Sequence, residues 1–376
     1  MLEIRLLHEE EFREAVNLSD QVFRDKEHIS MGKAFPHVFS NHLLQSYGAF
    51  IDQKLVAFTG LVPTLVHIGS AQLKVYSLGS VATHPEHRKK GYASEILKRI
   101  LDHINKSEAS LLLVSGDRDL YKRVNCFPFG TIHEYKLTPP SLSEHDFNIE
   151  NIREFEPTDW FQMKELADHR EVRFEQSIWD LAMLIKVEPF ASIYKMKHKV
   201  LVSTKDGKID AFLVIAMAYK SENRSESIVI EWAGDERALT GLMYYAVKKF
   251  NVMNIKLSVP WHEKKLIYEL NSLEYTVKLM PGTIHIVNSE RLFQQISPYL
   301  EEKDQKRFQL LKVTALDDGQ TQISANGESI LFNPLELVQL IFGGHLNSNN
   351  IGGELKVILN DLFPIPFPYT AGLNYV

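Results

Sequence analysis

The chain has 376 residues, of which 44% are hydrophobic and 24% are charged, so it can fill two or three folded domains and is not a disordered protein. Its 42 lysines and arginines against 48 aspartates and glutamates give a formal net charge of −6, which argues against broad nucleic-acid binding. A single cysteine, Cys126, excludes an internal disulfide and a thiolate zinc site.

The hydropathy of the chain predicts a cytoplasmic protein. Its first residues are too charged for a signal peptide. The longest apolar stretch, 211–219, is too short to cross a bilayer. We therefore expect no membrane association, and the oligomeric state stays open, with a homo-oligomer among the alternatives.

The first part of the chain is predicted to be rich in strands. Apolar spacing indicates a short strand over 2–7 and a helix over 9–18. Three longer strands follow, and they are predicted over 47–51, 54–68 and 71–81. The apolar residues between Ala93 and Ile104 recur at helical spacing, and the run 111–114 suits a buried strand.

A proline pair near residue 139 predicts a domain boundary. Beyond it, residues 206–212 repeat the aspartate, lysine, alanine and phenylalanine of residues 52–58 at the same positions. The strand, helix and strand that follow this repeat are predicted over 227–233, 238–250 and 254–259. We therefore expect a duplicated fold.

A third unit is expected from residue 284 onward. Its helices and strands are predicted over 290–300, 308–315, 321–325 and 334–341, with turns at 317–319 and 326–327 and a helix end at Gly343 and Gly344. The tail, 362–376, combines prolines with aromatic residues. It is too apolar to hang in water, so we expect it to be docked.

The strongest site signal is the basic loop at residues 88–91, between a strand and the amphipathic helix. The N-terminus of a helix offers unpaired N–H groups and a positive dipole end, both of which suit a phosphate. Three cations add charge, and Gly91 lets the backbone approach a ligand. The alternative is a solvated basic turn with an ordinary helix cap.

The second copy of the fold differs at this loop. It carries Asp235 and Glu236 where the first copy carries the three cations. Two carboxylates would repel a pyrophosphate, so we do not expect a second nucleotide site.

Arg88, Gly91 and Ala93 follow a strand that ends at Thr83, and this pattern resembles the acyl-CoA loop of the GCN5-related N-acetyltransferases (GNAT) over residues 1–137. The resemblance implies that loop amides hold the pyrophosphate of acetyl-CoA and that the preceding strand pairs with the pantetheine arm. It also implies direct attack by an amine, without a metal. The residues that we expect to bind the cosubstrate are Val81, Ala82, Thr83, Arg88, Lys89, Lys90, Gly91, Tyr92, Ala93, Ser94, Ser115 and Gly116.

Tyr121 lies where the family has a tyrosine that protonates the departing thiolate. A phenol with a pKa of about 10 is protonated at neutral pH and can donate to sulfur. Asn125 and Cys126 replace the Gly-Phe pair of the family. Asparagine tolerates left-handed backbone, so the turn can survive. The alternative is that Tyr121 is a core or surface residue.

Two other candidates carry less weight. Cys126 has no base near it in sequence and is expected to be a small buried residue. His84 and His87 have the spacing of a metal pair but lack a third ligand and stand beside three cations. We expect neither a cysteine nucleophile nor a metal site.

The whole-chain arrangement is similar to that of the enhanced-intracellular-survival (Eis-like) acetyltransferases. The resemblance implies an α/β (α+β) chain with tandem GNAT folds, each a mixed central β-sheet flanked by helices, and a small C-terminal α/β domain like a sterol carrier protein. The expected domains are 1–138, 139–283 and 284–376. The resemblance also implies that the terminal carboxylate, here that of Val376, acts as general base.

These resemblances imply an acetyl-CoA-dependent N-acetyltransferase that acts on an amine of a small molecule or peptide. Aminoglycosides, polyamines, peptide N-termini and lysine side chains all remain open as acceptors. The alternative is a non-catalytic acyl-CoA-binding regulatory or interaction protein, which the altered residues at Asn125 and Cys126 favour.

Overall fold

The computed structural model describes residues 1–142, 149–218, 226–316, 319–343 and 353–376. The chain forms two compact units. The first contains residues 1–130, 279–368 and 376, and the second contains residues 131–278 and 369–375. None of the helices in the described part of the chain has the length and apolarity that a bilayer-crossing segment needs.

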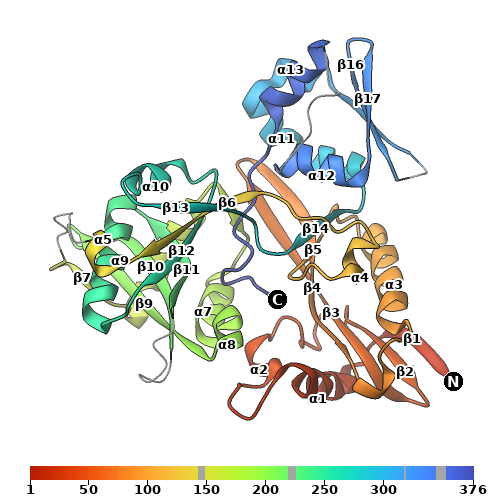
Figure 1. Cartoon of the computed structure of the whole chain (residues 1–376), viewed down its shortest axis with the longest axis horizontal. Coiled ribbons are helices and arrows are strands. Elements are labelled where there is room, and N and C mark those ends of the chain that lie inside the picture. The colour runs from red at the N-terminus through yellow and green to blue at the C-terminus, as the bar shows by residue number, and fades with distance from the viewer. Residues whose placement is uncertain (143–148, 219–225, 317–318, 344–352) are drawn as a thin grey trace. The chain divides into compact units, whose positions relative to one another are not determined.

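The first unit is built on a mixed sheet with the strand order β1-β2-β3-β4-β5-β14 (Figure 1). Its strands are β1 (Leu2–Leu6), β2 (Tyr47–Ile51), β3 (Lys54–Ile68), β4 (Ala71–Thr83), β5 (Leu111–Val114) and β14 (Thr283–Ile286). Neighbours pair antiparallel except β4 and β5, which are parallel. Its helices near the N-terminus are α1 (Phe12–Phe23), α2 (Met31–Ala34), α3 (Tyr92–Lys106) and α4 (Asp119–Lys122). The predicted hairpin, helix and buried strand are confirmed here.

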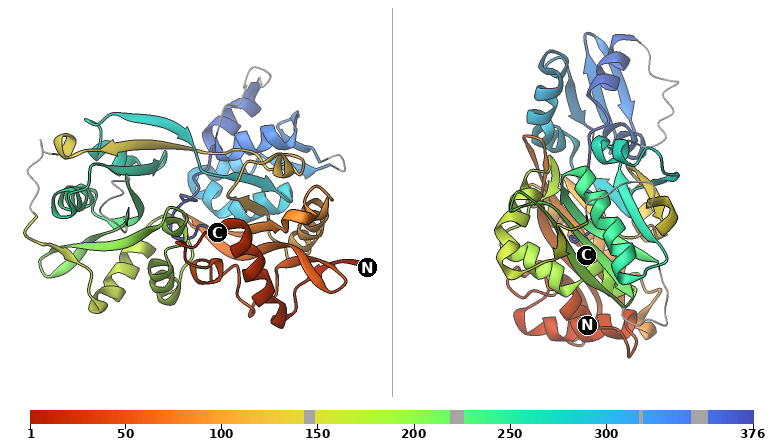
Figure 2. Two further views of the ribbon diagram at one scale, coloured as in Figure 1. Left: turned by 60° about the horizontal axis from the view of Figure 1, so that its bottom comes forward. Right: turned by 90° about the vertical axis from the view of Figure 1, so that its left-hand side faces the viewer.

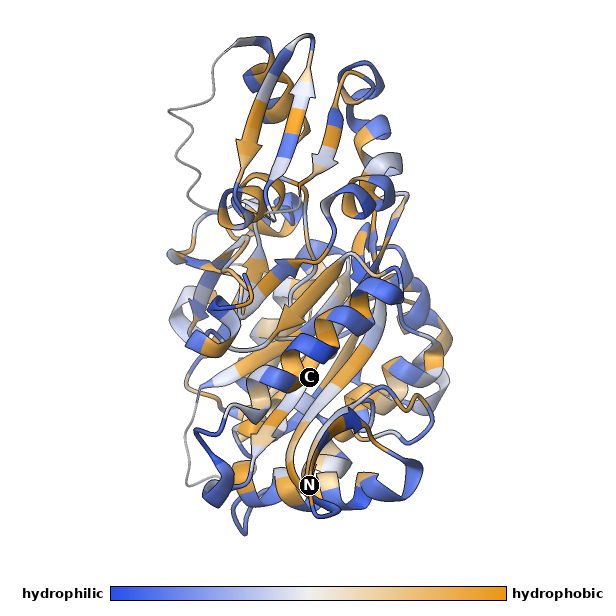
Figure 3. Ribbon diagram, turned by 90° about the vertical axis from the view of Figure 1, so that its right-hand side faces the viewer, coloured by the Kyte–Doolittle hydropathy of each residue, from blue (hydrophilic) through white to orange (hydrophobic). Residues whose placement is uncertain are grey.

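Helix α3 packs across the first sheet and shows why this amphipathic sequence folds as it does. Figure 3 shows its hydrophilic side facing outward over the hydrophobic strands. Its apolar positions recur every three or four residues, so they share one face. The buried ones are Ile96, Leu97, Ile100 and Ile104. Each such side chain stabilises the fold by about 1.5–3 kcal/mol.

The second unit repeats this plan, with the strand order β7-β9-β10-β11-β12-β6-β13. Its strands are β6 (Thr131–Leu137), β7 (Ile152–Glu154), β8 (Val172–Phe174), β9 (Met196–Lys205), β10 (Lys208–Ala218), β11 (Ser227–Gly234), β12 (Ile255–Pro260) and β13 (Tyr275–Leu279). Its helices are α5 (Pro139–Leu142), α6 (Trp160–Asp168), α7 (Ile178–Val187), α8 (Pro189–Ile193), α9 (Glu236–Phe250) and α10 (Lys264–Glu269). Strands β11 and β12 are parallel, as β4 and β5 are. The predicted duplication is confirmed.

Each unit contains one strand that follows the other copy of the fold in sequence. Strand β6 directly follows the first copy in sequence but pairs antiparallel with β12 of the second. Strand β14 follows the second copy but pairs antiparallel with β5 of the first. The compact units therefore divide the chain at 130 and 278, whereas the sequence placed the divisions at 138 and 283. Proline and polar composition mark loops, and here they do not reveal the partner of an adjacent strand.

The first unit also carries a small antiparallel sheet, β15 (Lys312–Ala315), β16 (Thr321–Ala325) and β17 (Glu328–Phe332). Helices α11 (Ser289–Phe308) and α13 (Gly353–Leu362) pack against it (Figure 2), and α12 (Pro334–Phe342) contacts β17. The strand predicted from residue 308 begins later because α11 continues to Phe308. The predicted turn residues 317–318 and Gly344 lie outside the described residues.

The tail is docked, as predicted. Phe363, Ile365 and Phe367 are buried in the first unit, where Ile365 N donates to Ile341 O at 2.7 Å. Residues 369–375 belong to the second unit, in which Leu373 is completely buried. Burial of these apolar groups removes the cost of leaving them in water.

Candidate functional site

Strand β4 continues past the end of its ladder with β5. The parallel ladder joins Val75–Leu78 to Leu111–Val114 and stops there, while β4 continues to Thr83 beside β3 alone. The register with β3 shifts between Phe58 and Gly60, and Ser80 opposite this bulge has a φ of +52°. The edge of β4 after Leu78 therefore has no β5 partner, and its backbone groups can bond to an extended ligand.

The loop after β4 presents the N-terminus of α3 without a side-chain cap. Gly91 is the N-cap residue, with a φ of +83° that favours glycine. A Cβ built on Gly91 would meet no atom within 4 Å, so the loop faces open space. The N–H groups of Tyr92, Ala93 and Ser94 start the helix and have no carbonyl partner within it. These groups can receive an anion.

Arg88, Lys89 and Lys90 add positive charge to this opening. All three side chains are exposed, and none forms an ion pair with any residue that the structure describes. Arg88 Nε donates to the Thr83 carbonyl at 3.4 Å, which ties the loop to the end of β4. The structure thus brings the cations and the helix N-terminus next to the end of β4 at Thr83, an arrangement that suits an anion.

Ser115 and Gly116 follow β5, and Tyr121 lies beside them in α4. A Cβ built on Gly116 would lie 3.3 Å from the Tyr121 ring. Tyr121 is 5% exposed and belongs to the apolar cluster beneath α3. Its carbonyl accepts bonds from Val124 N and Cys126 N at 3.0 Å each, which close the turn after α4.

The structure confirms the prediction about the turn at Asn125, which has a φ of +61°. Cys126 is completely buried, and burial raises the pKa of its thiol to about 12. A thiol with that pKa carries no thiolate at neutral pH, which fits the expected role as a small core residue.

The His84 and His87 rings pack edge to face with their centroids 5.7 Å apart, and His87 lies 6.4 Å from the Tyr92 ring. Within the described ranges, no group of three histidine, cysteine or acidic side chains is arranged to hold a metal ion.

The C-terminus of the chain returns to β4. A Cβ built on Gly79 would lie 3.4 Å from the carboxyl carbon of Val376 and 2.7 Å from Val38 Cγ2. Such a Cβ would crowd the Val38 side chain and would lie at ordinary contact distance from Val376. The terminal carboxylate is therefore beside β4, two residues before Val81 and within the first unit. Sequence reasoning had not singled out Gly79, although a glycine inside a strand is a signal for a bulge or a close approach.

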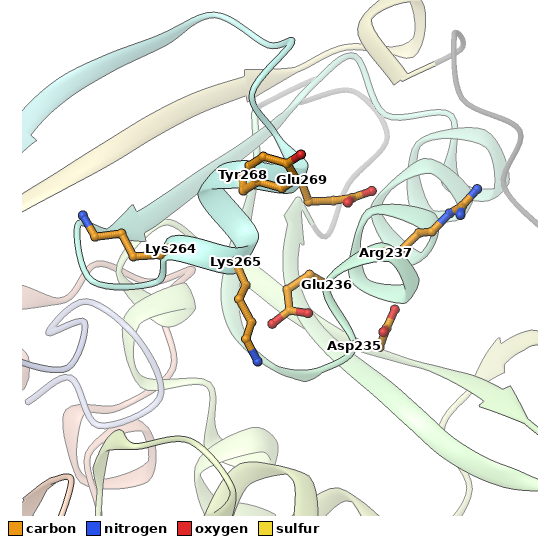
Figure 4. A pocket seen from close by; sticks show the side chains of 7 residues that line it. All are labelled: Asp235, Glu236, Arg237, Lys264, Lys265, Tyr268 and Glu269. Carbon is orange, nitrogen blue, oxygen red and sulfur yellow. The ribbon is translucent and has the colours of Figure 1, made fainter.

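The second unit closes the equivalent helix N-terminus with its own side chain. Asp235 caps α9, and its carboxylate accepts from Ala238 N at 2.9 Å. A carboxylate thus occupies the place that an anion would need. A cavity of about 490 Å³ lies at this helix start. Figure 4 shows its lining residues, Asp235, Glu236, Arg237, Lys264, Lys265, Tyr268 and Glu269. Its mixed charges differ from the three cations of the first unit.

The acetyltransferase (GNAT) domain model matches residues 3–128. No curated protein matches the sequence. A GCN5-related N-acetyltransferase from Kribbella flavida is similar in structure, with 12% identity, full coverage of both chains and a TM-score of 0.68. Eis1 from Mycobacterium abscessus has 11% identity, coverage of 98% of this chain and 99% of its own, and a TM-score of 0.64. A GCN5-related N-acetyltransferase from Anabaena variabilis has 11% identity, 98% coverage of both chains and a TM-score of 0.66. These likenesses show a shared fold over the whole chain.

Proposed function

Because residues 3–128 form a domain of the GNAT acetyltransferase family, we propose that this chain moves the acetyl group of acetyl-CoA to an amine of a small molecule or peptide. The observation that carries the proposal is the uncapped start of α3 at Gly91. It follows three cations that form no ion pair with the described residues, and these follow the part of β4 that has no β5 partner. Backbone amides and cations together suit a pyrophosphate.

In this proposal, the basic loop and the start of α3 bind the pyrophosphate. Residues 81–83 pair with the pantetheine arm, since the β4 edge after Leu78 has no β5 partner. Ser115 and Gly116 border the arm at the end of β5. The thioester carbonyl then lies between β4 and Tyr121, where backbone N–H groups can polarise it.

The chemistry needs one proton acceptor and one proton donor. The amine nitrogen attacks the thioester carbonyl, forms the amide bond and releases sulfur as the C–S bond breaks. The terminal carboxylate of Val376 takes the ammonium proton, directly or through water. Tyr121 donates its phenolic proton to the leaving sulfur and is later reprotonated from solvent. The position of Val376 beside Gly79 supports the first role.

Two further expectations stay predictions. One is that the small sheet with α11, α12 and α13 is a sterol-carrier-like domain. The other is that the protein works in the cytoplasm.

The function is tested by measuring release of free CoA thiol from acetyl-CoA with purified protein and a panel of amines. The panel covers aminoglycosides, polyamines, peptides with free N-termini and peptides with internal lysines. We expect thiol release that depends on at least one class. Binding of CoA with no release for any amine would favour the non-catalytic alternative.

Tyr121→Phe tests the acid role. It removes only the hydroxyl, so the packing of the ring against Gly116 persists. We expect kcat to fall at least about tenfold while the Kd for CoA is retained, because general acid catalysis is worth roughly a hundred- to ten-thousand-fold. Single-turnover measurements ensure that chemistry limits the rate. An unchanged single-turnover rate would remove Tyr121 from the mechanism.

A further inference from the structure

Strand β14 borders β5 on the edge that faces away from β4. Its four residues pair with Leu111–Val114 along the whole strand. Because successive residues of a strand face opposite sides, Thr283 and His285 share one face. Ile284 and Ile286 share the other. The strand thus places its two polar side chains together, next to the segments that follow β5.

Thr283 holds the end of β5. Its hydroxyl donates to the Gly116 carbonyl at 3.0 Å, and the residue is 2% exposed. Gly282, just before it, has a φ of +90°, and a Cβ there would come within 2.5 Å of the Val114 carbonyl oxygen. The backbone of β14 therefore approaches the end of β5 as closely as glycine allows, and the hydroxyl fixes the carbonyl of Gly116.

His285 holds the turn after α4. Its Nδ1 lies 3.2 Å from the Asn125 carbonyl, and only a protonated Nδ1 can donate to that oxygen. Burial lowers the pKa of His285 to about 4, so the ring is neutral at pH 7 and keeps this single proton. Beside it, Phe127 and Ile284 exchange two backbone hydrogen bonds of 2.9 Å.

Tyr121 lies between these two attachment points. Its ring lies against Gly116, which Thr283 binds, and its turn ends at Asn125, which His285 binds. A sheet edge that served packing alone would need neither polar side chain, since the backbone ladder already joins β14 to β5. Both polar contacts go instead to the backbone on either side of Tyr121.

We propose that Thr283 and His285 are positioning residues for the acyl transfer, and that they fix the Tyr121 hydroxyl relative to the leaving sulfur. The inference rests on the proposed function. It makes the site of the first copy depend on a strand that follows the second copy in sequence.

The test compares paired variants in the full chain. Thr283→Val and His285→Leu remove the donors, while Thr283→Ser and His285→Asn keep a hydroxyl and a donor near Nδ1. The donor-less variants should lower kcat about tenfold with the KM for acetyl-CoA within about twofold, because small displacements of a reacting group are costly. The conservative variants should restore kcat. Equal kcat in both members of each pair overturns the inference.

A control separates positioning from stability. Thr321→Val removes another buried hydroxyl, which donates to Ser289 Oγ at 2.9 Å in the small sheet. It should lower the unfolding temperature and leave kcat unchanged. All rates are measured well below the lowest unfolding temperature. If Thr283→Val does not fold, the His285 pair carries the same test.

The same variants in a Tyr121→Phe background distinguish the positioning role of Thr283 and His285 from the acid role of Tyr121. If Thr283 and His285 act through Tyr121, removing their donors costs no further kcat once the phenol is gone. The same loss with and without the phenol overturns the inference and leaves the acid role intact. An unchanged rate for Tyr121→Phe alone overturns the acid role, and the inference with it.

Discussion

Gly91 is the residue on which the proposed pyrophosphate site depends most directly. It combines a left-handed backbone with open space, so a Cβ there would strain the loop and project toward the ligand. Gly207 in the hairpin before β10 offers a matched comparison, since its φ is +78° and a Cβ there also meets nothing within 4 Å.

We expect Gly91→Ala and Gly207→Ala to destabilise the protein equally, by about 1–2 kcal/mol, because both residues have positive φ. Only Gly91→Ala should weaken CoA binding, by at least about tenfold, through loss of backbone contact. Titration calorimetry with CoA and urea unfolding measure the two effects. Equal affinity in both variants would place the pyrophosphate elsewhere.

His262 is a largely buried histidine of the second unit, and its burial predicts a stability that depends on pH. Its side chain is 11% exposed, and neither ring nitrogen has a hydrogen-bond partner among the described residues. Burial lowers its pKa to about 4. In the unfolded state His262 has an ordinary histidine pKa of about 6.5. Between pH 6.5 and 4 the unfolded state therefore binds a proton that the folded state does not bind.

The contribution of neutral His262 to the free energy of unfolding should be fully present above pH 6.5 and should be lost as the pH falls toward 4. His262→Phe should remove this pH dependence, which is a slope of up to about 1.4 kcal/mol per pH unit in the free energy of unfolding. His169→Phe is the control, because His169 is exposed. Urea unfolding at pH 7, 6 and 5 gives the slopes. If the free energy of unfolding changes with pH in the same way in wild type and in His262→Phe, His262 is not the source of the pH dependence.

At the scale of elements, helices α3 and α9 are equivalent in the two copies but begin differently. Helix α3 starts at a glycine without a side-chain cap, and α9 starts at Asp235, which caps Ala238 N. A helix start can bond to its own carboxylate or to a bound anion, and one group excludes the other. The start of α9 is therefore closed by its own side chain, whereas the start of α3 is not.

We expect one CoA per chain. Asp235→Ala should destabilise the protein by about 1 kcal/mol through loss of the cap and should not create a second CoA site, because Glu236 remains and the three cations are absent. Calorimetric stoichiometry measures this. A value near two CoA per chain, in wild type or in the variant, would contradict the assignment.

At the scale of the whole molecule, the proposed base is the carboxylate of Val376, which depends on where the chain ends. Residues 363–367 are anchored in the first unit and 369–375 in the second, and Val376 ends beside Gly79. The terminal carboxylate is therefore a group that any added residue would convert into an amide.

An extension of several polar residues after Val376 should abolish turnover and leave CoA affinity intact, since an amide cannot accept the ammonium proton. The same residues added before Met1 provide the control, because Met1 is 88% exposed and its ion pair with Asp52 is worth little. Removal of Tyr375 and Val376 should have the effect of the C-terminal extension. Full activity in the C-terminally extended chain would assign the base to another group.

The sequence by itself determined the local elements and the repeated plan. The spacing of apolar residues in α3, the apolar runs of β2 and β3 on either side of a turn, and the shared residues of 52–58 and 206–212 all lie within short stretches, so they can be recognised without a fold. The same holds for the basic loop with Gly91, for which pyrophosphate binding is proposed from charge and backbone freedom.

The tertiary structure alone decided the exchange of β6 and β14, the anchors from Thr283 and His285 to Gly116 and Asn125, and the return of Val376 to Gly79. Each joins positions far apart along the chain. Apolar alternation tells which face of a strand is buried but does not tell which strand lies beside it, because backbone hydrogen bonds are the same for every sequence. For that reason the local pattern carries no signal that β14, which follows the second copy, pairs with β5 of the first.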